Sequence, residues 1–245
     1  MPQTEQNAES RIAIAPNFAW DGQKAYLFDI DGTLLRSHDR VHLESFTASV
    51  RKVLGHEISL EGIALQGNTD MAILSEACRQ SGISATALAE RTDAILREMC
   101  RIVAARRHEL KLRLMPGVKE FLHYLSEKNA LLGVASGNLE AIGWIKIEEA
   151  GLRPWFSFGG FSDRFLARSE LVADAVRQAR ERMGATEKIC VIGDTPRDIE
   201  AARANALPII AVATGQPSFD ELLACRPEAC VSSLADLLAW TGAAQ

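Results

Sequence analysis

Two aspartates stand two positions apart directly after a short apolar run. Residues 25–28 lead into Asp29, and Asp31 follows after one isoleucine. An extended chain places both carboxylates on the same side, where their repulsion favours a divalent cation. Gly32 allows a sharp turn, and Thr33 adds a hydroxyl. An isolated Asp-x-Asp-Gly is also a common turn at a strand end, so the catalytic interpretation depends on further motifs.

Two more polar motifs follow apolar runs later in the chain. Ser136-Gly137-Asn138 comes after residues 130–135, and Gly193-Asp194-Thr195-Pro196-Arg197-Asp198 comes after residues 189–192. Taken alone, each is an ordinary strand end followed by a helix N-cap. Their significance lies in their combination with the first motif.

The apolar runs predict strands buried on both faces, as in a parallel sheet. They span 25–28, 130–135, 189–192 and 208–213. Segments with apolar residues at helical spacing separate them, so the alternation predicts a doubly wound, Rossmann-like α/β sheet. In such sheets ligands bind at the carboxyl ends of the strands. We therefore expect Asp29, Ser136 and Asp194 to meet in one crevice.

The chain between the first and second motifs has a different pattern. Residues 36–113 contain helical stripes, interrupted near Gly82, and no convincing strand. We interpret them as an inserted all-helical cap domain. The α/β catalytic core then comprises 21–35 and 114–245, and we expect 1–20 to be a disordered tail.

The bulk composition excludes several classes of protein. The 245 residues carry a net charge of −5, without the basic excess of a nucleic-acid binder. Five cysteines without a CxxC pair argue against a disulfide framework or a zinc knuckle. No apolar run approaches the ~18–20 residues of a membrane span, and residues 1–10 lack the features of a signal peptide. We expect a cytoplasmic protein with no membrane or nucleic-acid partner.

The three motifs, in this order, resemble those of the haloacid-dehalogenase superfamily. The resemblance extends from about residue 25 to 231 and is nearest to phosphoglycolate-phosphatase-like and β-phosphoglucomutase-like members. It implies a Rossmann-like core with a mobile cap inserted after the first motif. It also implies phosphoryl chemistry that depends on Mg²⁺.

The resemblance assigns a role to each motif. Asp29 is the expected nucleophile and Asp31 the general acid and base. Ser136 is expected to donate a hydrogen bond to the transferring phosphoryl group. The other expected substrate-binding positions are Gly32, Thr33, Gly137 and Asn138.

The expected metal ligands are oxygen atoms, which Mg²⁺ prefers. They are the carboxylates of Asp29 and Asp194 and the backbone carbonyl of Asp31. Asp198 is expected to bind through water or to orient its neighbours.

One family feature is missing. Members usually carry a lysine before the helix that precedes the last motif, and no lysine lies between Trp155 and Gly184. Arg168 is our first choice to replace it as a substrate-binding residue, and Arg164 is the second. An arginine keeps the charge but binds phosphate oxygens through a planar fork.

Two features of the cap leave alternatives open. Thr69 and Asp70 lie in a segment resembling the loop before a cap helix in phosphoglycolate-phosphatase-like members. They either face the active site or simply begin a helix. His38 and His42 have a metal-like spacing, but without further ligands we interpret them as an exposed helix face.

Together these features predict a Mg²⁺-dependent phosphatase. It would hydrolyse a small phosphorylated metabolite through an aspartyl-phosphate, with phosphoglycolate as the substrate suggested by the resemblance.

The main alternative is a β-phosphoglucomutase-like phosphoryl transfer, which shares every core motif. A dehalogenase would not be expected to carry Asp31. A non-catalytic protein on this fold is supported only by the missing lysine. The sequence does not determine the oligomeric state.

Overall fold

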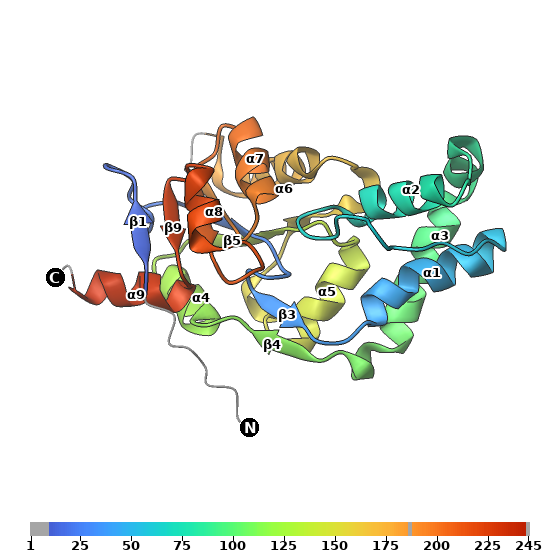
Figure 1. Cartoon of the computed structure of the whole chain (residues 1–245). Coiled ribbons are helices and arrows are strands. Elements are labelled where there is room, and N and C mark those ends of the chain that lie inside the picture. Colours follow the sequence, from blue (N-terminus) through green and yellow to red (C-terminus); the bar gives the residue numbers. More distant parts are fainter. Residues whose placement is uncertain (1–9, 186–187, 244–245) are drawn as a thin grey trace, which may run out of the picture.

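A seven-stranded sheet forms the centre of the core, in the order β1-β9-β8-β7-β2-β5-β6. The computed structural model describes residues 10–185 and 188–243, with the core and the cap at opposite ends (Figure 1). The strands are β1 (Ile12–Ile14), β2 (Ala25–Phe28), β5 (Leu131–Ala135), β6 (Gly159–Gly160), β7 (Ile189–Gly193), β8 (Ile209–Val212) and β9 (Ala229–Val231). All pair in parallel except β1, which runs antiparallel to β9.

Helices cover both faces of this sheet. Helices α4 (Val118–Glu127), α5 (Glu140–Glu149) and α9 (Leu234–Ala243) pack on one face; α6 (Arg168–Met183), α7 (Pro196–Ala204) and α8 (Phe219–Ala224) pack on the other. In β2, Tyr26 and Phe28 join the first hydrophobic cluster while Ala25 and Leu27 join the second. Both sets are buried, which explains the uninterrupted apolar runs. The expected fold class is confirmed.

The cap is built from three helices, α1 (Val41–Leu54), α2 (Asp70–Gln80) and α3 (Ala85–Ala105). It is joined to the core by a short antiparallel ribbon of β3 (Leu35–Ser37) and β4 (Leu112–Leu114). The expectation that residues 36–113 contain no strand is therefore wrong at their two ends. Each strand has only three residues, too few to show an alternating pattern.

The cap and the core share one hydrophobic cluster. Leu139, Ile142 and Ile145 of the α5 region are buried among apolar side chains of α1, α2 and α3. The short 3-10 helices η1 (Arg107–Glu109), η2 (Arg153–Trp155) and η3 (Ser162–Arg164) lie in the connections. The cap is thus packed down onto the core, above the carboxyl ends of the strands.

The N-terminal segment corrects one expectation. We expected disorder over residues 1–20, but Ile12–Ile14 forms the edge strand β1 and Trp20 is buried in the core. Residues 1–9 lie outside the described part. Among the described residues, no helix is both long and apolar enough to cross a membrane.

Candidate active site

The polar motifs converge where three neighbouring strands end. β2 lies between β5 and β7 in the sheet, so Asp29, Ser136 and Asp194 stand side by side at their carboxyl ends. The crevice expected from the sequence is therefore present. After β2 the chain adds β5 and β6 on one side of this strand and then β7 on the other side. Ligands of open α/β sheets usually bind where the strand order reverses in this way.

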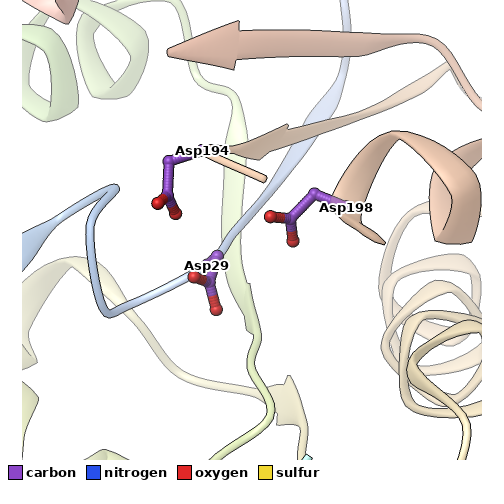
Figure 2. Close-up of side chains that lie close together, drawn as sticks. All are labelled: Asp29, Asp194 and Asp198. Carbon is purple, nitrogen blue, oxygen red and sulfur yellow. The ribbon is translucent and has the colours of Figure 1, made fainter. Parts of the chain in front are cut away.

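Three buried carboxylates form an acidic cluster in this crevice. Oxygens of Asp29, Asp194 and Asp198 all lie within 4.8 Å of one another, and Figure 2 shows the three side chains close together. Burial raises the pKa of Asp29, and the charges of nearby carboxylates raise it further, against the opposing effect of Arg168. Burial and the charges of Asp29 and Asp198 likewise raise the pKa of Asp194 well above its usual value.

The chemistry of this donor set fits Mg²⁺. Hard carboxylate oxygens at close range are its preferred protein ligands, and a divalent cation would offset the repulsion that raises these pKa values. Asp194 accepts a hydrogen bond from the Thr33 hydroxyl at 3.0 Å. Asp198 accepts from the backbone N–H and the hydroxyl of Thr195 at 3.0 and 2.6 Å. Thr33 is completely buried, so its hydroxyl orients a carboxylate and does not reach the cavity.

Arg168 reaches the acidic cluster from the first turn of α6. Its Nη2 lies 2.6 Å from Asp29 Oδ1 and 2.7 Å from Asp198 Oδ1, with 7% of the side chain exposed. Its Nε also donates to Asp198 Oδ1 at 2.7 Å. Arg164, the second choice, is exposed. Asp198 therefore contacts both Arg168 and Thr195.

Asp31 is bound by partners other than those of the acidic cluster. Its Oδ2 accepts hydrogen bonds from Lys146 Nζ at 2.7 Å and from Asn138 Nδ2 at 2.8 Å. Burial raises the pKa of Asp31, but the Lys146 charge and these two hydrogen bonds outweigh it and leave the pKa below its usual value. Asp31 is therefore held as a carboxylate.

Glycines allow the backbone to approach the site closely. Gly32 has a φ of 95°, and a Cβ there would lie 2.2 Å from Asp194 Oδ2. At Gly137 a Cβ would lie 2.3 Å from the carbonyl oxygen of Asn68 in the cap. Both positions therefore exclude any side chain, and the second lets the cap loop contact the end of β5.

Comparison with known proteins decides the family. A model described as haloacid dehalogenase-like hydrolase matches residues 23–205. The chain belongs to this family. Phosphoglycolate phosphatases of Synechococcus elongatus and Agrobacterium fabrum are each 25% identical over 217 residues. The first match covers 88% of this chain and 95% of the Synechococcus protein. The second covers 86% of this chain and 89% of the Agrobacterium protein.

Solved structures of this family share the fold. A structure from Haemophilus somnus, described as a predicted phosphoglycolate phosphatase, superimposes with a TM-score of 0.64 at 20% identity. The superposition covers 90% of this chain and 98% of the Haemophilus chain. A putative β-phosphoglucomutase from Thermotoga maritima gives a TM-score of 0.52 at 18% identity and covers 88% and 98%. At these identities the likeness concerns the fold alone.

A cavity of about 520 Å³ lies between the core of this hydrolase and its cap. Asp29, Asp31 and Arg168 line it from the core, and His42, Phe46 and Asn68 line it from the cap. Side chains of both polar and apolar character therefore surround Asp29 and Asp31. Its size suits a small ligand rather than a polymer.

The cap loop is fastened to the core by buried hydrogen bonds. Thr69 donates to the Leu166 carbonyl at 2.8 Å and caps α2 by accepting from Ala72 N–H. Asp70 accepts from the Leu139 N–H at 2.8 Å and is paired with His42 at 3.0 Å. Thr69 and Asp70 thus hold the cap against the site.

The interpretation of His42 as part of an exposed helix face is wrong. Its side chain is 15% exposed and lines the cavity from the first turn of α1, because Asp70 fixes it there. His38 precedes the helix and is exposed.

Lys146 is the main site residue that sequence reasoning missed. A signal was present, since a lysine interrupts the apolar positions of a helix directly after the Ser136 motif.

Proposed function

We propose that this chain is a Mg²⁺-dependent phosphatase that hydrolyses a small phosphate monoester through an aspartyl-phosphate on Asp29. The observation that carries the proposal is the placement of Asp29 close to both Arg168 and Asp194 at the end of β2, where all three line the cavity between core and cap. That arrangement supplies a carboxylate nucleophile, a guanidinium for phosphoryl oxygens and a carboxylate donor set for the metal.

In the first step, a carboxylate oxygen of Asp29 attacks phosphorus while the bond to the leaving oxygen breaks. Arg168, the Ser136 hydroxyl and the backbone around Gly137 bind the phosphoryl oxygens. Asp31 gives a proton to the leaving alcohol. The negative charge of the ester beside Asp31 favours its protonated form, because like charges raise a carboxyl pKa.

In the second step, water attacks phosphorus and the bond to Asp29 breaks, releasing inorganic phosphate. Asp31 takes the proton from the attacking water, and the carboxylate form held by Lys146 and Asn138 suits this role. Bound Mg²⁺, held by Asp29, Asp194 and the backbone carbonyl of Asp31, would offset negative charge and help to fix the phosphoryl group. The docked cap would exclude bulk water.

The substrate class is supported by the curated relatives. Both are phosphoglycolate phosphatases, and the alignments span most of each protein. This favours hydrolysis over mutase-like transfer and makes phosphoglycolate the first substrate to test.

The test is a screen of phosphorylated metabolites and p-nitrophenyl phosphate with purified protein and Mg²⁺. We expect phosphate release from a small monoester, loss of activity in EDTA, recovery with Mg²⁺ and no activity for Asp29→Asn. Absence of phosphate release from every compound would overturn the proposal. Transfer of phosphate to a sugar phosphate without release would favour the mutase.

A further inference from the structure

Lys146 is a buried ammonium whose role is not explained by packing. Only 4% of its side chain is exposed. Along α5 it is surrounded by the buried residues Ile142, Ile145 and Ile147. An apolar side chain would fit this stripe without the cost of removing a charge from water. The charge therefore needs an explanation in its partners.

Those partners form a closed ring of hydrogen bonds. Lys146 Nζ donates to Asp31 Oδ2 at 2.7 Å and to Asn138 Oδ1 at 2.8 Å. Asn138 Nδ2 donates to the same Asp31 oxygen and to Ser136 Oγ, both at 2.8 Å. The amide of Asn138 is thus fixed at both ends, and Asp31 is held by two donors whose own positions are fixed.

Exposure differs sharply between the two charges. Both residues line the cavity, but 40% of the Asp31 side chain is exposed against 4% of the Lys146 side chain. An ion pair with a purely structural role has no need to open one partner to a cavity. Both donors bind Oδ2, and the described residues offer no hydrogen-bond partner for Oδ1. This leaves Oδ1 as the oxygen available to a ligand.

We propose that Lys146 is a positioning residue, which holds Asp31 directly and through Asn138 in the orientation required for proton transfer. The inference rests on the proposed function, in which Asp31 exchanges the proton. Without the ammonium, one donor to Oδ2 is lost and the Asn138 amide can turn over. Asp31 can then rotate away from the reacting oxygen.

The two reaction steps respond differently when the leaving group is weakly basic. p-Nitrophenolate departs without a proton, so the first step on p-nitrophenyl phosphate does not need Asp31. Hydrolysis of the aspartyl-phosphate still needs it as a base. Lys146→Met should therefore slow steady-state turnover by about 10-fold or more while sparing the first turnover, since general base help is worth ~10²–10⁴ in rate.

The measurement is rapid mixing of protein, Mg²⁺ and p-nitrophenyl phosphate with detection of p-nitrophenolate. For Lys146→Met we expect a burst of about one equivalent per site, and a ratio of burst rate to steady-state rate at least about 10-fold above that of the original protein. Lys146→Gln keeps one neutral donor and provides a second variant in case Lys146→Met does not fold. It should also raise the ratio of burst rate to steady-state rate, but by a smaller factor.

Lys128→Met is the matched control, because it removes a half-exposed lysine that is paired with Asp21 and does not line the cavity. It should leave both rates unchanged. Equal slowing of burst and steady state in the two Lys146 variants, or unchanged turnover in either, would overturn the inference. If the unsubstituted protein releases no p-nitrophenolate, the proposed function fails instead, so the two failures are distinguishable.

Discussion

Arg168 Nη2 lies 2.6 Å from Asp29 Oδ1, although the whole cap lies between the two residues in the sequence. The contact is possible because α6 begins at Arg168 beside the end of β2. The same nitrogen lies 2.7 Å from Asp198 Oδ1. A guanidinium is thus fixed beside the proposed nucleophile, which supports the proposal that Arg168 takes the place of the family lysine.

Removal of this cation should slow catalysis strongly. For Arg168→Ala we expect kcat to fall by about 10²–10³, the usual loss for one preorganised group that stabilises transition-state charge. Arg168→Lys should recover only part, because an ammonium cannot reproduce the planar fork. Steady-state kinetics with p-nitrophenyl phosphate and inhibition by inorganic phosphate measure both effects.

Arg164→Ala is the control for this prediction, since Arg164 is the exposed arginine of the same segment. Its activity and its inhibition by phosphate should remain unchanged. A loss for Arg164→Ala equal to that for Arg168→Ala would contradict the assignment of the cation.

Asp31→Asn should separate proton transfer from phosphoryl transfer. The variant keeps the backbone carbonyl and the contacts around Asn138 but cannot exchange a proton. Turnover of an alkyl phosphate should fall by about 10²–10⁴. Mass spectrometry of acid-quenched samples with p-nitrophenyl phosphate should detect phosphoenzyme in Asp31→Asn and none in Asp29→Asn. Near-normal turnover of the alkyl ester would count against Asp31 as acid and base.

Asp70 should stabilise the docked cap. In Asp70→Ala the Leu139 N–H loses its acceptor and His42 loses its partner. A buried donor left unpaired costs about 1–3 kcal/mol, so the free energy of unfolding in urea should fall by about that amount. Asp93→Ala, an exposed aspartate of α3, is the control and should change stability by less than about 0.5 kcal/mol. Equal stability for both variants would show that the cap does not depend on this contact.

The core could be predicted from sequence because its strands are buried on both faces. Continuous apolar residues followed by a polar residue mark three of these strands in the sequence, Ala25–Phe28, Leu131–Ala135 and Ile189–Gly193. β1, in contrast, pairs antiparallel with β9 from the far end of the chain. Its three residues carry no local pattern, and only this long-range pairing defines the strand.

The candidate site was predictable where chemistry restricts residue type. A phosphoryl site needs a cation near Asp29, and this requirement together with the start of α6 pointed to Arg168. His42 and Lys146 could not be placed in the same way. Each depends on a tertiary partner, Asp70 for His42 and Asp31 for Lys146, and a sequence pattern does not reveal such pairs.

The acidic cluster should make stability depend on pH and Mg²⁺ together. The pKa values of Asp29 and Asp194 are raised by folding, so the folded chain binds more protons than the unfolded chain at pH values above the unfolded pKa of ~3.9. Stability of the metal-free protein therefore falls as pH rises from that value through the raised pKa values, and then levels off. Mg²⁺ binds the ionised carboxylates, so its stabilising effect should increase over the same range.

Thermal melts at pH 5 and pH 8, in EDTA and in Mg²⁺, should show a larger rise in Tm with Mg²⁺ at pH 8. Asp194→Asn should lose this rise and show a weaker pH dependence in EDTA, whereas Asp93→Asn should keep both. An equal rise in Tm with Mg²⁺ for Asp194→Asn would remove this aspartate from the metal site.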